Sequence, residues 1–115
     1  DSAKVQIALS SDSGASFTAP VLVASPETNG RVGTALLDSG KIIVSWIDTS
    51  SIEAKIMLSV FSGEAELLQQ VEVANISASR RSGFPIIESV GESVYISWTD
   101  LSDSLQVRVA RVSVK

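Results

Sequence analysis

The stretch RVGTALL at residues 31–37, followed by VSWID at residues 44–48, decides the fold of this chain, because both stretches return. Residues 81–87 read RSGFPII and residues 96–100 read ISWTD. The arginine and the glycine recur after 50 residues and the tryptophan after 52. A period of this length is typical of a supersecondary unit that cannot bury its own apolar faces and stacks on copies of itself. The sequence therefore predicts a propeller or solenoid.

Composition narrows the classes of function. The 115 residues suit a single domain, and 44% of them are hydrophobic. A net charge of −4 disfavours both nucleic acid and anionic membrane surfaces as partners. The chain has no cysteine and no histidine, which removes thiol nucleophiles, disulfides, Ser-His catalysis and the commonest metal ligands. We expect no cofactor and no metal. We also expect no membrane-spanning segment, because no apolar run approaches the ~20 residues that cross a bilayer.

Short apolar runs alternate with polar clusters, a pattern that predicts strands joined by tight turns. A helix over residues 64–70 is the competing interpretation, but it is too short to be stable without a cap or a packed face. The glycines of residues 38–40, 62–63 and 90–92 would supply the positive φ of the turns. Nine strands are expected: Lys4–Ser10, Pro20–Ala24, Gly33–Leu37, Lys41–Asp48, Ala54–Phe61, Leu67–Ala74, Gly83–Glu88, Ser93–Thr99 and Leu105–Val114.

The repeat groups these strands into about two four-stranded antiparallel blades of an all-β propeller. Residues 1–24 would hold the last two strands of one blade, residues 31–74 a complete blade, and residues 81–115 the first three strands of another. Gly14 and Gly63, 49 residues apart, place the first two units in phase. Residues 41–48 are apolar on both faces, as expected for a sheet between two others.

The segment SSDSGASF at residues 10–17 carries a family resemblance. It resembles the Asp-box, Ser-x-Asp-x-Gly-x-Thr-Trp or its Phe variant, which lies between the third and fourth strands of a blade in sialidase-like propellers. We expect the Asp12 carboxylate to accept turn amides, Gly14 to be left-handed and Phe17 to pack the turn into the blade. The motif residues are Ser10, Asp12, Gly14, Ser16 and Phe17.

The likeness to the C-terminal blades of bacterial BNR-repeat, exo-sialidase-related proteins implies a site on the opposite rim. Sialidases hold a sugar carboxylate with three arginines and use a tyrosine nucleophile paired with a glutamate, plus an aspartate acid/base. Arg31, Arg81, Asp48 and Asp100 fall on that rim and are the candidate ligand-binding residues. Two structural ion pairs, Arg31–Asp48 and Arg81–Asp100, are the favoured alternative explanation.

The aromatic residues point to packing. Tyr95, the sole tyrosine, takes the place of Ile43 in the repeat, so we expect it in the core, with no glutamate partner. Trp46 and Trp98 lie on apolar strand faces and are also expected in the core. No catalytic residue is therefore predicted in this chain. Asp100–Asp103 lacks the spacing of a calcium loop and reads as a turn.

These observations leave three hypotheses about function. The first is a noncatalytic propeller segment acting as a scaffold or as a surface that binds a ligand, for which an acidic glycan is the candidate. The second is part of a sialidase-type glycoside hydrolase whose catalytic residues lie in other blades or subunits, and the third is a pure assembly module.

Propellers close with about 4 to 8 blades. We therefore expect either self-association, for which three copies would give six blades, or missing blades in a longer chain. The sequence also begins at Asp1 without a leader, which fits either a removed leader or a piece of a longer protein. The resemblance implies a secreted or periplasmic location.

Overall fold

The computed structural model describes residues 4–24, 28–50, 53–76, 85–100 and 106–114, without the side chains of residues 28–31 and 100. All regular structure in this part is β-strand, which confirms the expected all-β class. Each of the nine predicted segments corresponds to one strand. The strands are β1 (Val5–Ile7), β2 (Val21–Ala24), β3 (Thr28–Leu36), β4 (Ile42–Asp48), β5 (Ala54–Phe61), β6 (Leu67–Ile76), β7 (Ile86–Val90), β8 (Ser93–Asp100) and β9 (Gln106–Ser113).

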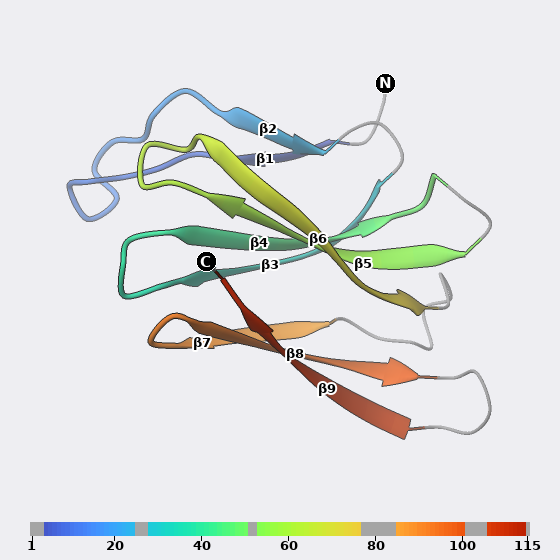
Figure 1. The fold of residues 1–115 in the computed structure, drawn as a ribbon. Helices are drawn as coiled ribbons and strands as arrows, with labels where there is room; N and C mark the ends of the chain where they lie inside the picture. Colours follow the sequence, from blue (N-terminus) through green and yellow to red (C-terminus); the bar gives the residue numbers. More distant parts are fainter. Residues whose placement is uncertain (1–3, 25–27, 51–52, 77–84, 101–105, 115) are drawn as a thin grey trace.

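The strands pair with their neighbours in sequence to form three antiparallel sheets (Figure 1). Their orders are β1-β2, β3-β4-β5-β6 and β7-β8-β9, and the sheets are not closed into a ring. The four-stranded sheet lies between the other two (Figure 1). The described chain is thus a stack of three up-and-down sheets.

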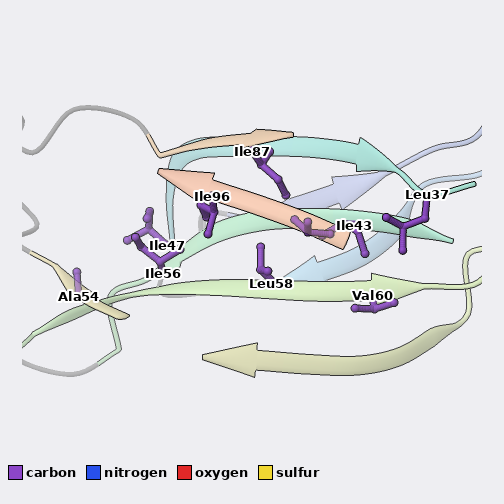
Figure 2. Close-up of a cluster of buried hydrophobic side chains, with 10 residues drawn as sticks. Leu37, Ile43, Ile47, Ala54, Ile56, Leu58, Val60, Ile87 and Ile96 are labelled. Atoms are coloured by element: carbon purple, nitrogen blue, oxygen red, sulfur yellow. The ribbon is translucent and has the colours of Figure 1, made fainter. Parts of the chain in front are cut away.

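Strand β4 shows why the middle sheet is buried on both sides. Five consecutive residues, 43–47, are buried. Ile43 and Ile47 belong to a cluster shared with Ile87 and Ile96 of the β7–β9 sheet (Figure 2). Val44 and Trp46, on the other face, belong to a second cluster, which includes Val5, Val23 and Ala24 of the β1–β2 sheet. The two-faced pattern predicted for residues 41–48 is confirmed, because each face removes apolar area from water against a different sheet.

The first strands of the two larger sheets lie in close contact at Gly33. A Cβ atom at this position would lie 2.7 Å from Ile87 Cγ2 and 2.9 Å from Ser45 Oγ. The glycine of the repeat is therefore required by the close approach of β7 to β3.

Hydrogen bonds between the turns of these two sheets fix the same contact. The Asp38 amide donates to the Gly91 carbonyl at 3.1 Å, and the Ser39 amide donates to Glu92 Oε2 at 2.7 Å. The Ser89 hydroxyl donates to the Leu36 carbonyl at 2.8 Å. The pKa of Glu92 is lowered from its usual range, mainly by the hydrogen bonds from Ser39.

The turn glycines behave as predicted at two of three positions. Gly40 and Gly91 have positive φ values of 91° and 60°. The prediction for Gly63 is wrong: among the described residues of that turn, the left-handed conformation falls on Ala65, with φ 65°. The Ser62 amide donates to the Glu66 carbonyl at 2.8 Å and the Ala65 amide donates to the Ser62 carbonyl at 3.0 Å. This hydrogen-bonding frame places the left-handed residue three positions after Ser62.

Strand β3 departs most from its predicted bounds. It begins at Thr28 instead of Gly33, and its register against β4 shifts between Asn29 and Gly33. Three residues of β3 there oppose the single residue between Ile47 and Ser45 on β4. Such a bulge has no strong signature in a single sequence.

Candidate functional site

Figure 1 separates the two ends of the stack. The β1–β2 loop and the β3–β4, β5–β6 and β7–β8 turns lie at one end. Asp48 closes β4 and Asp100 closes β8, both at the other end. This arrangement follows from the up-and-down order of the strands. It puts the loop of residues 10–17 and the two aspartates at opposite ends, as predicted for them.

The loop of residues 10–17 is held by hydrogen bonds between its own residues. Asp12 Oδ1 accepts the Ser16 amide at 2.9 Å and the Ser10 hydroxyl at 2.8 Å. Ser10 Oγ accepts the Gly14 amide at 2.8 Å, and the Ser16 hydroxyl donates to Asp12 Oδ2. Gly14 is left-handed, with φ 92°, as predicted. The Asp12 carboxylate is therefore committed to its own turn.

These hydrogen bonds lower the pKa of Asp12 to about 2. The Ser16 hydroxyl contributes most, followed by the Ser16 amide and the Ser10 hydroxyl. Each donates to the ionised carboxylate and so favours it. The turn is anchored to the ends of the strands by Leu9 and Thr18: the Thr18 amide donates to the Leu9 carbonyl at 2.8 Å, and the Leu9 amide donates to Thr18 Oγ1 at 3.0 Å.

The side chain of Phe17 does not pack this turn against the stacked sheets. Its side chain is 64% exposed, so the expectation of a packed aromatic is wrong for this structure. The buried residues that join the β1–β2 sheet to its neighbour include Val5 and Ala24. These two pair with each other at the end of the sheet remote from the loop.

A second turn repeats the serine geometry of the first. Ser62 Oγ accepts the amides of Glu64 and Glu66, both at 3.2 Å. These are the second and fourth residues after Ser62, as Asp12 and Gly14 are after Ser10. The third residue is left-handed in both turns, Ser13 with φ 60° and Ala65 with φ 65°.

The equivalent positions are therefore Ser10 and Ser62, 52 residues apart, the same spacing as the two tryptophans. The predicted alignment of Gly14 with Gly63 is wrong. The repeated pattern, serine followed two residues later by an acidic residue, was the signal in the sequence that could have given the correct phase.

On the opposite rim, the described partner of Asp48 is local. Asp48 Oδ1 accepts the Ser50 amide at 2.8 Å. Its pKa is lowered, first by the Ser50 hydroxyl, then by that amide, with a smaller contribution from the charge of Lys55. Asp48 thus stabilises the turn that follows β4, a role that needs no ligand.

The structure describes the other candidate ligand-binding residues of this rim only in part. The backbone of Arg31 lies in the irregular part of β3, and its side chain lies outside the described residues, as does that of Asp100. Arg81 lies outside them altogether. The ion pairs Arg31–Asp48 and Arg81–Asp100 and the alternative anion clamp stay predictions.

The tryptophans pack as expected. Trp46 is buried and its Nε1 donates to Ser59 Oγ at 2.8 Å, while Gln70 Nε2 donates to the same hydroxyl at 3.2 Å. Trp98 is partly buried and packs against the cluster between the two larger sheets. Both side chains therefore serve the packing of sheets.

The prediction for Tyr95 is wrong. Its side chain is 38% exposed, because it lies on the face of the β7–β9 sheet that turns away from the core residues Val94 and Ile96. The register also places Glu88 and Arg111 directly opposite Tyr95 on its two neighbouring strands. The expectation that the tyrosine has no glutamate beside it is therefore also wrong.

A groove that the sequence did not indicate lies between the β1–β2 sheet with its loop and the facing parts of β3, β4 and the β5–β6 turn. Its volume is about 970 Å³, and Ile7, Leu9 and Val21 line it together with Thr34 and Leu36. Leu36 is 66% exposed. A leucine in an apolar strand is normally read as a core residue, so its exposure could not be predicted. The lining is mainly apolar, with Ser10, Thr18 and Glu64 among its polar residues.

In the described part of the chain, no group of three or more acidic residues could hold a metal ion. No helix long and apolar enough to cross a membrane occurs among the same residues. No family model, curated protein or solved structure matches the chain.

Proposed function

We propose that this chain is a noncatalytic segment of a sialidase-like β-propeller, whose role is to hold successive sheets face to face as a scaffold. The observation that carries the proposal is the burial of β4 on both faces against two different sheets. A sheet with one solvated face would leave half of these apolar side chains in water. A blade packed between two other blades buries both faces.

The contact between the two larger sheets supports a propeller over a flat stack. It is tight between their first strands, at Gly33 and Ile87, and hydrogen bonds join the adjoining turns. In a propeller the first strand of each blade lies nearest the axis, where neighbouring blades approach most closely. The serine turns at Ser10 and Ser62 add a second feature that repeats with the sheets.

Binding of an acidic glycan at the rim of Arg31, Arg81, Asp48 and Asp100 belongs to the same proposal. Guanidinium groups match a carboxylate bidentately. Loss of thermal stabilisation by sialic acid in an Arg31→Ala/Arg81→Ala variant that keeps its wild-type circular dichroism would support this binding. No stabilisation of the wild-type chain would leave the scaffold role alone.

The scaffold role can be tested by cross-linking the sheets. The chain has no cysteine, so a Ser39→Cys/Glu92→Cys variant introduces one pair at the turns that are hydrogen-bonded to each other. We expect a short bifunctional maleimide to link this pair within one chain. A Ser39→Cys/Val107→Cys control, with its second cysteine on β9, should not link. Equal linking in both variants would contradict a fixed stack.

The noncatalytic part has its own test, a fluorogenic sialoside assay. We expect no turnover. Turnover that is lost in a Tyr95→Phe variant would contradict the proposal and favour the glycoside hydrolase alternative, since Glu88 lies beside this tyrosine.

A further inference from the structure

One face of the β7–β9 sheet is apolar and covered by nothing among the described residues. This outward face carries Ile86 and Val90 on β7, Tyr95 on β8, and Val107 and Val109 on β9. The four aliphatic side chains are 63%, 67%, 74% and 67% exposed. These apolar residues share the face with Ser93, Ser97 and Thr99 of β8. Several exposed apolar side chains on one sheet face indicate an interaction site.

The strand register gives the outward face a charge pattern. Glu88 on β7 pairs with Tyr95 on β8, and Tyr95 pairs with Arg111 on β9. Directly opposed residues point to the same side of a sheet, so a negative and a positive charge lie on its two edge strands, with the tyrosine between them. In the next row, Ile86 and Val109 lie on either side of Ser97.

This pattern is self-complementary about one axis only. A two-fold axis that runs along β8 in the plane of contact places β7 of one copy over β9 of the other. Glu88 then faces Arg111 of the partner subunit, and Ile86 faces Val109 of the partner subunit. A two-fold axis that crosses the strands at Tyr95 places β7 over β7 and brings the two Glu88 carboxylates together, which is repulsive.

We propose that a second copy of this chain covers the outward face, by a two-fold contact of the two β7–β9 sheets with the axis along β8. Two Glu88–Arg111 pairs flank the stacked tyrosines, and the apolar edge residues complete the contact. An isologous contact of this kind closes at a dimer. The inference depends on the register of three described strands. It applies to the chain on its own, because a following blade of the proposed propeller would occupy the same face.

Charge reversal and mixing test this arrangement. The wild-type chain is expected to be a dimer by light scattering at tens of micromolar. Glu88→Arg and Arg111→Glu, measured separately, are each expected to weaken the dimer at least about tenfold, because each places like charges together at both ends of the contact. An equimolar mixture of the two variants should restore the dimer, since both charge pairs are then opposite again.

Matched controls change the same charges elsewhere. Glu64→Arg and Lys4→Glu alter exposed residues away from the outward face and should leave the dimer intact. A monomeric wild-type chain, a larger head-to-tail assembly, or a mixture that fails to dimerise would each overturn the inference. The Ser39–Glu92 cross-link reports on the stack within one chain, so its result separates a failure of this inference from a failure of the scaffold role.

Discussion

Strands β4 and β8 share the Ser-Trp pair that marks the repeat, yet they end in different surroundings. In β4, residues 43–47 are all buried. In β8, Val94 and Ile96 are buried while Tyr95, the counterpart of Ile43, is 38% exposed. The difference comes from the neighbours: within the described part of the chain, β4 has a sheet on each side, and β8 has one on a single side. The apolar pattern of a strand therefore shows which of its faces can be buried. Whether a face is buried depends on whether another sheet packs on it.

Truncating Ile43 of β4 and the equivalent Tyr95 of β8 should give the largest difference in stability between the two strands. Ile43→Ala creates a cavity between two sheets and is expected to lower the free energy of unfolding by about 2–5 kcal/mol. Tyr95→Ala removes an exposed ring and should cost less than about 1 kcal/mol. Urea denaturation of both variants in a Glu88→Arg background, which keeps the outward face uncovered, measures the difference. Equal losses would show that the stack does not bury β4 more than β8.

The contact between β3 and β7 gives the next largest effect. Gly33→Ala places a Cβ atom 2.7 Å from Ile87 Cγ2 and is expected to destabilise the chain by about 1–3 kcal/mol. Gly63→Ala is the control, because its Cβ atom would lie at an ordinary 3.7 Å from the Gly40 carbonyl oxygen. The melting temperature should fall in the first variant and change little in the second. An unchanged melting temperature for Gly33→Ala would mean that the sheets do not approach so closely.

Loss of the buried hydrogen bond of Trp46 should lower the stability by as much as Gly33→Ala, or by less. Ser59→Ala leaves the Trp46 indole N–H in the core without its acceptor. We expect a loss of about 1–3 kcal/mol from this unsatisfied donor. Ser11→Ala, at an exposed position of the β1–β2 loop, is the control and should cost less than about 0.5 kcal/mol. If both variants unfold alike, the indole has another partner.

The turn of residues 10–17 should give the smallest effect on stability, with a defined pH dependence. The pKa of Asp12 is about 2 in the folded chain and 3.8 without its partners, so its stabilising contribution is present above about pH 4 and is lost as the pH falls toward 2. Asp12→Asn should therefore melt below wild type at pH 7, with the gap closing in acid. Glu64→Gln, in the second serine turn, is the comparison. A gap that persists at pH 2 would contradict the role of the carboxylate.

The periodic part of this structure could be predicted because it rests on local chemistry. Alternating apolar residues placed all nine strands, and consecutive apolar residues in β4 correctly indicated two buried faces. The side-chain pattern of residues 10–17 correctly gave the hydrogen bonds of Asp12 and the left-handed Gly14.

The remaining features depend on contacts that no local pattern encodes. The exposure of Tyr95, Phe17 and Leu36 depends on which sheets lie beside them. The left-handed residue of the β5–β6 turn moved from Gly63 to Ala65 because the Ser62 hydrogen bonds fix the turn length. The irregular part of β3, which contains Arg31, likewise could not be predicted from the local sequence. The candidate rim was the hardest part to predict, since the backbone of Arg31 lies in this irregular part of β3 and not before the strand.

The stacking of consecutive sheets is the central claim, and the contact of Gly33 with Ile87 tests it most directly. A nuclear Overhauser effect between the Gly33 α-protons and the Ile87 γ2-methyl group measures this contact in solution. We expect a strong cross-peak, alongside those between Thr34 and Val44 within one sheet. Cross-peaks within the sheets but none between Gly33 and Ile87 would contradict the stack.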